Sequence, residues 1–269
     1  MWKSRDQGGC ALSIETQAYC NHSCSVCPRN LDPTHSRFAA NGEPLYDIMS
    51  TSLVEDLIRQ AAEMGWKGPV HFSHYSEPLW DKRFIRFSKY AIKYGLVPEL
   101  FTNGSLLSPE LIKEIDGLIP YVVISFNSPG SQKYWASKFA KSTVRITKRY
   151  GVLIWNKDTS LIQPAISRVA EKPCTGPPLV AFRINYTGQM SMCYADFNNA
   201  FGLLNASSAS LRDLWYGKEH TKAIKEMSQP GSRQHRALCR QCPEVFPDKG
   251  TSVEVKNRKP IPSEEFWQY

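Results

Sequence analysis

Short apolar runs alternate with amphipathic helical patterns along the first 150 residues of the chain. Apolar runs that read as strands are found at 10–16, 69–73, 97–101 and 121–126. Amphipathic segments that read as helices are found at 50–65, 81–95 and 108–117. Short, largely apolar strands separated by helices are typical of parallel sheets that helices cover. The order therefore predicts an α/β fold with right-handed βα crossovers, in a parallel sheet or barrel.

Each predicted helix carries start and stop signals. Ser52 and Glu55 have the spacing of a capping box, and Asp81 has the position of an N-cap. Ser108 precedes Pro109, whose fixed φ angle suits the first position of a helix. The three helices are expected to end at Gly65, Gly95 and Gly117. Glycine closes helices because it readily adopts the left-handed conformation.

The pattern changes beyond about residue 160. Residues 172–199 read as two short strands around a Thr-Gly turn, and 210–227 as an amphipathic helix. The basic segment 138–150 is interpreted as one face of a surface helix. The sequence therefore predicts a βα domain at 8–160, a smaller hairpin and helix domain at 161–250, and a polar tail at 251–269.

Polar segments follow each predicted strand at the point where it ends. The first strand is followed by "CNHSCSVC" at 20–27, and the second by "HYSEPL" at 74–79. The third leads into "TNGS" at 102–105, and the fourth ends in "SFNSPG" at 125–130. The carboxyl ends of parallel strands meet at one edge of the sheet, where α/β proteins bind ligands. The sequence thus predicts one mouth to which all four segments contribute.

Composition and charge narrow the class of protein. The chain has 269 residues, 42% of them hydrophobic, which suits one large α/β domain with a small appendage. No apolar run is long enough to span a bilayer, and the start of the chain lacks the apolar segment of a signal peptide. We therefore expect a cytoplasmic protein with no membrane partner. The net charge of +8 is scattered, which favours a solvated basic surface over nucleic-acid binding and leaves an anionic substrate open.

Cys20, Cys24 and Cys27 form a C-x3-C-x2-C pattern within eight residues. Eight cysteines in a chain without export signals favour metal binding over disulfides. A structural zinc site needs four ligands, so zinc would recruit His22 or His35 as the fourth. The alternative is a four-iron cluster with one iron open to a substrate or cofactor. The eighth cysteine, Cys10, is interpreted as a buried residue at the start of the first strand.

This cysteine pattern at the end of a first strand resembles that of the radical S-adenosylmethionine superfamily. The resemblance implies a partial (β/α)6 barrel and a [4Fe-4S] cluster held by Cys20, Cys24 and Cys27, whose open iron binds S-adenosyl-L-methionine. In that family, an electron from the reduced cluster cleaves the cofactor to methionine and a 5′-deoxyadenosyl radical, which takes hydrogen from a substrate. The resemblance also implies an external one-electron donor such as flavodoxin or ferredoxin.

The other strand ends resemble the contacts that the family makes with S-adenosylmethionine. "YSEPL" resembles the Gly-Gly-Glu-Pro motif, with Tyr75 and Ser76 in place of the glycines and Glu77 where the family holds the amino group of the cofactor. Val26 stands where the family usually has an aromatic residue near adenine, and Asn103 where it contacts the methionine moiety. The implied cofactor contacts are Val26, Ser76, Glu77, Asn103, Ser125 and Asn127.

A second set of cysteines supplies four further candidate ligands, Cys174, Cys193, Cys239 and Cys242. By spacing alone, zinc and an iron–sulfur cluster fit this set equally well. Gly188, five residues before Cys193, resembles the start of the SPASM and twitch auxiliary-cluster domains of the same superfamily. That resemblance implies a second [4Fe-4S] cluster, fully ligated by protein. It would either accept an electron from a substrate radical or serve only as a structural staple.

Three functions remain open. The first is a radical oxidoreductase that dehydrogenates or epimerises a carbohydrate-like or alcohol substrate, and the second is a radical enzyme that modifies a peptide. The third is a zinc-stapled nucleic-acid-binding protein, which leaves the motif order unexplained and lacks a clustered basic stripe. The candidate catalytic residues are His74, Tyr75, Arg183, Tyr194 and Asp196. A histidine or aspartate among them would take the proton from a substrate hydroxyl.

Overall fold

A computed structural model describes residues 10–22, 40–42, 44–125, 131–147, 173–174, 181–193, 196, 199, 201–235 and 239. Its strands form one sheet in the order β5-β4-β3-β2-β1-β6-β7. The strands are β1 (Ala11–Ile14), β2 (Pro69–His71), β3 (Val97–Thr102), β4 (Tyr121–Ser125), β5 (Thr143–Thr147), β6 (Ala181–Ile184) and β7 (Met190–Ser191). Neighbours are parallel from β5 through β6, and only β7 is antiparallel to its neighbour. The predicted α/β fold with a parallel sheet is confirmed.

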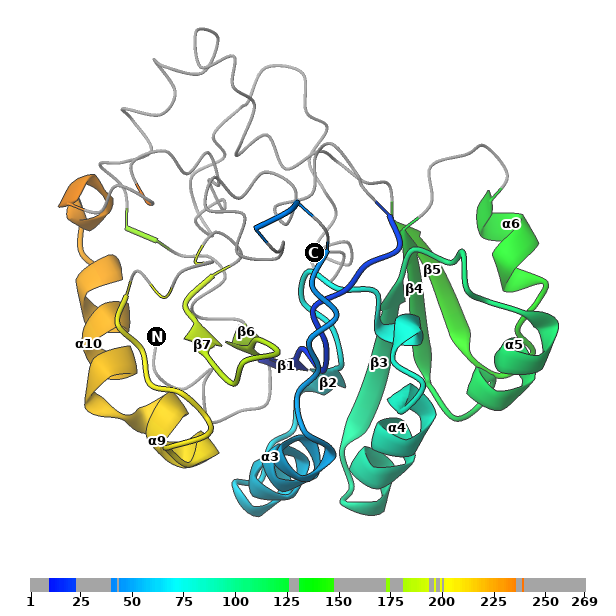
Figure 1. Ribbon diagram of the computed structural model, residues 1–269, viewed down its shortest axis with the longest axis horizontal. Coiled ribbons are helices and arrows are strands. Elements are labelled where there is room, and N and C mark those ends of the chain that lie inside the picture. The colour runs from blue at the N-terminus through cyan, green and yellow to red at the C-terminus, as the bar shows by residue number, and fades with distance from the viewer. Residues whose placement is uncertain are drawn as a thin grey trace, which may run out of the picture.

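Helices cover this sheet, as the parallel arrangement requires. Figure 1 shows α3, α4 and α5 arrayed along one side of it. The helices are α3 (Thr51–Glu63), α4 (Phe84–Lys93), α5 (Pro109–Ile115), α6 (Ser131–Ala136), α9 (Leu211–Tyr216) and α10 (Lys218–Met227), with 3-10 turns η1 (Pro78–Trp80) and η4 (Ser232–His235). None of the helices in the described part of the chain has both the length and the apolar character needed to cross a bilayer.

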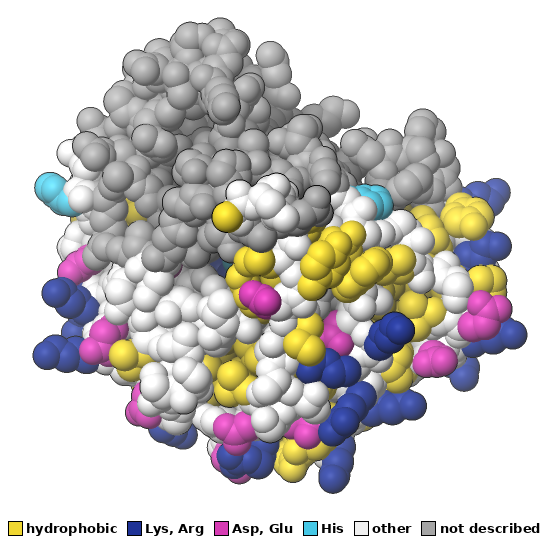
Figure 2. Space-filling view, in the orientation of Figure 1, with side chains coloured by type: hydrophobic (Ala, Val, Ile, Leu, Met, Phe, Trp, Pro, Cys, Tyr) yellow, Lys and Arg dark blue, Asp and Glu magenta, His cyan; other side chains and the backbone are white. Residues whose placement is uncertain are grey.

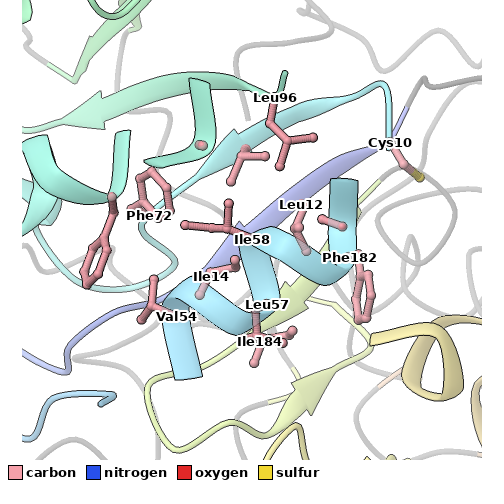
Figure 3. Close-up of a cluster of buried hydrophobic side chains, with 14 of the residues drawn as sticks. Cys10, Leu12, Ile14, Val54, Leu57, Ile58, Phe72, Leu96, Phe182 and Ile184 are labelled. Atoms are coloured by element: carbon pink, nitrogen blue, oxygen red, sulfur yellow. The ribbon is translucent and has the colours of Figure 1, made fainter. Parts of the chain in front are cut away.

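Part of the hydrophobic core lies between the sheet and α3. Leu12 and Ile14 of β1 pack with Leu57 and Ile58 of α3, and all four side chains are fully buried (Figure 3). Burying each such side chain stabilises the fold by about 1.5–3 kcal/mol. Successive strand residues point to opposite faces. Glu15, the next residue after this strand, therefore belongs to the opposite side of the sheet, where it too is fully buried.

The predicted C-terminal hairpin continues the main sheet. Its strand β6 runs parallel to β1, with Phe182 beside Leu12. Trp215 of α9 stacks on Phe182 with ring centroids 4.7 Å apart, and the Leu211 amide donates to Gln60 of α3 at 2.6 Å. The expected helix at 210–227 is split into α9 and α10, because the backbone leaves the helical conformation at Gly217. The hairpin and helix region after residue 160 is thus joined to the βα region before it through β6 and α9.

Two predicted helix starts are wrong. The N-cap of α3 is Ser50, whose hydroxyl accepts from the Leu53 amide at 3.2 Å, and Glu55 instead pairs with Arg86 at 2.8 Å. Both Ser50 and Ser52 fit the sequence rule for a cap, so the pattern could not choose between them. Helix α4 begins at Phe84, because Asp81 uses its carboxylate to bind the backbone and guanidinium of Arg83. The predicted stops at Gly65, Gly95 and Gly117 are confirmed by positive φ angles.

The helix predicted across 138–150 is also wrong. Residues 143–147 form strand β5, which pairs along β4 from Tyr121 to Ser125. Thr143 to Thr147 alternate polar and apolar side chains, a period of two that the surrounding basic residues obscured. Among the described strands, β5 stands at one end of the sheet order.

Asp116 joins the end of α5 to the start of β5. Its carboxylate accepts hydrogen bonds from the amides of Ala140, Lys141 and Ser142 at 2.8–2.9 Å. Burial acts to raise the pKa of this carboxyl, but the three amide donors outweigh it, so its pKa lies below the ordinary value. The ionised carboxylate therefore stabilises the fold above the unfolded-state pKa of about 3.9, and this contribution is lost as the pH falls through the lower, folded-state pKa.

We expect Asp116→Ala to lower the free energy of unfolding by about 2 kcal/mol at pH 7, because three amides lose a charged acceptor. The difference from the unsubstituted protein should shrink below about pH 4, where the carboxylate becomes protonated. Urea unfolding of the variant and the unsubstituted protein, at pH 7 and below about pH 4, measures this difference in the free energy of unfolding. Glu114→Ala, at an exposed position on the same helix, is the matched control and should change stability by less than about 0.5 kcal/mol. Equal losses at the two pH values would contradict this account.

Candidate active site at the carboxyl ends of the strands

The loops after β1 and β3 meet at Cys20. The side-chain amide of Asn103 lies with its nitrogen 4.0 Å from the Cys20 sulfur and donates to Asn21 Oδ1 at 2.9 Å. Asn21 in turn donates to the Ser105 hydroxyl at 2.8 Å. Cys20 is partly exposed, whereas Asn103 is buried. The predicted convergence of the first and third strand ends is therefore present at the level of side-chain contacts.

Glu77 links the loop after β2 to the end of β3. Its carboxylate accepts from the Thr102 hydroxyl at 2.6 Å and from the Asn103 amide at 2.8 Å. Its own amide donates to the carbonyl of Tyr19 at 3.0 Å, the residue before Cys20. Gln17 donates to the carbonyls of both Tyr19 and Glu77. Glu77 is 2% exposed, so this carboxylate is held at the junction of three strand ends, away from bulk water.

The turn at 102–105 explains how Asn103 reaches Cys20. Asn103 Oδ1 accepts from both the amide and the hydroxyl of Ser105, which closes a local turn around Gly104. Gly104 has a φ of +81°, and a Cβ there would lie 2.8 Å from the Ile124 side chain. Only glycine satisfies both conditions. The Asn-Gly pair thus aims the Asn103 amide nitrogen at the cysteine loop.

His74 and Tyr75 lie close to Glu15, which is not among the site residues predicted from the sequence. The amide of Tyr75 donates to Glu15 Oε1 at 2.8 Å, and the rings of His74 and Tyr75 lie 3.7 Å apart. Glu15 donates its own amide to the Ile184 carbonyl at 2.8 Å, beside Arg183 on β6. Arg183 is 4% exposed, so an arginine and a carboxylate are both buried near the centre of the sheet. Sequence analysis does not single out Glu15, because its partner, the Tyr75 amide, is 60 residues away along the chain.

A second acidic group was also missed. His71 of β2 lies beside Glu99 of β3, with Nε2 and Oε2 3.0 Å apart. Both belong to strands whose sequences are largely apolar. Their register, which sets His71 directly beside Glu99, is a long-range property that no local pattern encodes.

Three cysteines of the second set lie at the ends of C-terminal elements. The Cys174 amide donates to the carbonyl of Met227 at the end of α10, at 2.7 Å. Cys193 follows β7, and Cys239 follows η4. Asp196, a candidate catalytic residue, is buried and forms hydrogen bonds with the backbone of Met192 and of Cys193. It accepts from the Met192 amide at 2.9 Å, and its own amide donates to the Cys193 carbonyl at 3.1 Å. The contacts described for Asp196 thus hold the turn that presents Cys193.

Several predicted site residues lie outside the described part of the chain. They are Cys24, Val26, Cys27, Asn127, Tyr194 and Cys242. Ser125 is described at the end of β4, in register with Thr147 of β5. Because each cysteine set is only partly described, no group of three potential metal-binding side chains is found among the described residues.

The described residues suit the cofactors that the sequence implies. Cys20 offers a partly exposed thiol beside an amide donor, and hydrogen bonds to cluster sulfurs are one way in which proteins adjust an iron–sulfur centre. The Ser76 hydroxyl is buried and has no hydrogen-bond partner within the described structure. A buried hydroxyl without a partner is costly, so a bound ligand that pairs with it would be favoured. A cluster beside Cys20 and a polar cofactor near Ser76 are therefore consistent with this site.

Comparison with known proteins adds independent evidence. Residues 174–243 match the SPASM family of iron–sulfur cluster-binding domains. The chain is 22% identical over 242 residues to S-adenosyl-L-methionine-dependent 2-deoxy-scyllo-inosamine dehydrogenase of Niallia circulans, covering 87% of this chain and 92% of the relative. The matched SPASM region contains all four cysteines of the second set. The predicted similarity of the second cysteine region to a SPASM domain is therefore confirmed.

Solved structures share the fold. The crystal structure of BtrN in complex with AdoMet and 2-DOIA is similar with a TM-score of 0.66 at 20% identity, covering 87% of this chain and 93% of that chain. SuiB of Streptococcus suis bound to the precursor peptide SuiA is similar with a TM-score of 0.56 at 13% identity, covering 86% of this chain and 70% of that chain. The resemblance inferred from the cysteine spacing and the strand ends is confirmed at the level of the fold.

Proposed function

We propose that this chain, a radical S-adenosylmethionine enzyme with a SPASM domain and a relative of 2-deoxy-scyllo-inosamine dehydrogenase, oxidises a hydroxyl group of a carbohydrate-like small molecule. The observation that carries the proposal is the junction of Cys20, Asn103 and Glu77 at the strand ends. The relationship with a dehydrogenase over nearly the full length of both chains supports the reaction type.

Each residue of the junction has a distinct task in this proposal. Cys20, with Cys24 and Cys27, holds the first cluster. When bound there, the cluster and S-adenosylmethionine supply a radical that removes a hydrogen atom from a carbon of the substrate. Asn103 donates toward the Cys20 sulfur and fixes the loop through Asn21. Val26, Ser76, Ser125 and Asn127 are the further cofactor contacts in this proposal.

Glu77 is proposed to receive the amino group of S-adenosylmethionine. Its carboxylate is held in place by hydrogen bonds from Thr102 and Asn103, so little conformational entropy would be lost when the amino group of the cofactor binds. We expect Glu77→Gln to raise the Kd of S-adenosylmethionine at least about tenfold, because a charge-assisted hydrogen bond is replaced by a neutral one. Isothermal titration of the reconstituted protein measures this.

Thr102→Val is the matched control for Glu77, because it removes one donor to the carboxylate and leaves the charge. It should lower the free energy of unfolding by about 1–2 kcal/mol and change the Kd less than Glu77→Gln does. If Glu77→Gln binds S-adenosylmethionine as tightly as the unsubstituted protein, Glu77 serves only to join β2 to β3.

Removal of hydrogen from a carbinol carbon leaves a radical that must lose one proton and one electron to become a ketone. His74 or Asp196 is proposed to take the proton, with Tyr75, Arg183 and Tyr194 as substrate contacts. The second cluster, held by Cys174, Cys193, Cys239 and Cys242, is proposed to take the electron. Because all four of its irons would be ligated by protein, it suits electron transfer and has no position open to S-adenosylmethionine.

The test is anaerobic incubation with S-adenosylmethionine, dithionite and a panel of aminocyclitols and other polyols. The proposal predicts 5′-deoxyadenosine and a ketone in equal amounts. Epimerisation would instead return hydrogen from solvent, so incorporation of deuterium from D2O into an inverted alcohol would identify an epimerase. Formation of 5′-deoxyadenosine with neither product, across the panel, would count against a carbohydrate-like substrate.

Peptide modification is the second candidate. The observation in its favour is the structural likeness to SuiB, which is described bound to a precursor peptide. The chain covers less of SuiB than of BtrN and is less similar to it, so the small-molecule reaction is preferred. A peptide library that yields modified product where the polyol panel yields none would reverse this preference.

A further inference from the structure

An exposed aromatic patch borders the loop that carries Cys20. Tyr19 stacks on Tyr46, with ring centroids 4.6 Å apart and planes inclined by 18°, and packs against Trp80 at 4.4 Å. Tyr46, Ile48 and Trp80, which together form this aromatic patch, are 59%, 63% and 43% exposed. Large apolar side chains grouped on the surface of a soluble protein usually mark a binding site. Figure 2 shows hydrophobic side chains gathered on the face that it draws.

Backbone hydrogen bonds connect the aromatic patch to the candidate active site. The carbonyl of Tyr19 accepts from the Glu77 amide, and the Trp80 amide donates to the Glu77 carbonyl at 3.1 Å. Ala18 donates to the carbonyl of Asp47, and Ile48 forms a β-bridge with Gln17. The segment that carries Tyr46 and Ile48 is thus bound along the chain leading to Cys20. A partner that docks here would meet a preformed surface and lose little entropy in ordering it.

Cationic side chains extend from the patch along α4. Arg86, Lys89 and Lys93 are exposed, and their spacing of three and four residues sets them on one side of the helix. Lys82, also exposed, lies in the turn between Trp80 and the start of α4. Figure 2 shows Lys and Arg side chains gathered over the region that α4 occupies in Figure 1. Glu55 pairs with Arg86, and Asp47 is exposed within the patch, so the four cations exceed the two anions. The surface is therefore apolar near Cys20 and basic beside it.

We propose that the aromatic patch and the basic side of α4 are the docking surface for a small acidic protein that carries one electron on a flavin or an iron–sulfur centre. The inference rests on the proposed function, because it assumes a cluster at Cys20. One electron passes from the reduced carrier to that cluster, the carrier is oxidised, and no covalent bond forms or breaks. Redox encounters use small interfaces, aromatic residues serve as anchors, and complementary charge accelerates association.

The test compares a protein donor with a chemical one. Trp80→Ala and the double variant Tyr46→Ala/Trp80→Ala are prepared as holoenzymes, with Tyr134→Ala on α6 as the matched control at another exposed tyrosine. Formation of 5′-deoxyadenosine is followed with reduced flavodoxin, reduced ferredoxin or dithionite. Binding of oxidised flavodoxin and of oxidised ferredoxin is measured separately by isothermal titration calorimetry.

For at least one carrier, we expect the patch variants to raise both KM and Kd about tenfold, the effect of losing an aromatic anchor. The rate with dithionite should stay unchanged, and Tyr134→Ala should behave like the unsubstituted protein. Lys82→Glu/Lys89→Glu should slow reduction by the carrier and flatten its dependence on salt.

Three results would overturn the inference. The first is unchanged KM and Kd for both carriers in the patch variants. The second is an equal loss of activity with dithionite, which would mean that the patch supports the active site itself. The third is a shift from dimer to monomer in sedimentation, which would identify the patch as a contact between two copies of this chain. If the unsubstituted protein forms no 5′-deoxyadenosine even with dithionite, the proposed function fails instead.

Discussion

Replacing Cys20 by alanine is expected to abolish the formation of 5′-deoxyadenosine from S-adenosylmethionine and to remove about four iron atoms per chain. The physical reason is that Cys24 and Cys27 alone cannot hold a cluster that needs three protein ligands to leave one iron open. The sulfur of Cys20, the described member of this set, lies beside Asn103 at the junction of the strand ends. Iron analysis and chromatography of the reaction products measure both effects.

Cys10→Ala is the matched control, because it removes a thiol that is buried at the start of the same strand. It leaves a small cavity and should cost about 1–2 kcal/mol of stability, while iron content and 5′-deoxyadenosine formation stay unchanged. If Cys20→Ala retains full iron and full cofactor cleavage, the assignment of the first cysteine set is wrong.

The second large effect is expected for Cys239→Ala/Cys242→Ala. This variant should lose about four iron atoms and at least about 100-fold in substrate oxidation, while it still forms 5′-deoxyadenosine. The reason is that cofactor cleavage needs only the first cluster, whereas conversion of the substrate radical to a ketone needs an electron acceptor. Product analysis separates the two steps.

A structural role for the second cluster predicts a different outcome. Cys239 packs against the hydrophobic core, so a cluster that only staples the module would leave the variant less stable but still able to oxidise substrate. Thermal unfolding followed by circular dichroism shows whether the variant is folded. Retained oxidation in a folded variant would assign the second cluster to stability alone.

Local signals in the sequence were sufficient where the structure depends on neighbouring residues. Ser108 caps α5 by accepting from the Leu111 amide, and Gly95 and Gly117 end their helices with positive φ angles. The convergence of strand ends was also predictable, because parallel connectivity brings them to one edge whatever the side chains are. This is why Cys20, Glu77 and Asn103 could be grouped from the sequence.

Contacts between segments that are distant in the sequence could not be predicted from local patterns. In the segment that forms β5, the surrounding basic residues favour a surface helix, whereas the period of two spans only five residues and its partner β4 is distant in sequence. Glu77 was expected to face the cofactor, but its bonds to Thr102 and to the Asn103 amide depend on the positions of β2 and β3 together. The partner of Glu15 follows likewise from the tertiary arrangement.

The most direct test of the central claim is a count of iron, labile sulfide and zinc in the protein purified without oxygen. Two [4Fe-4S] clusters predict about eight iron and eight sulfide per chain and no zinc. About four iron with one zinc would retain the radical enzyme and make the SPASM region a structural staple. Zinc alone, persisting after attempts at iron–sulfur reconstitution, would contradict the account.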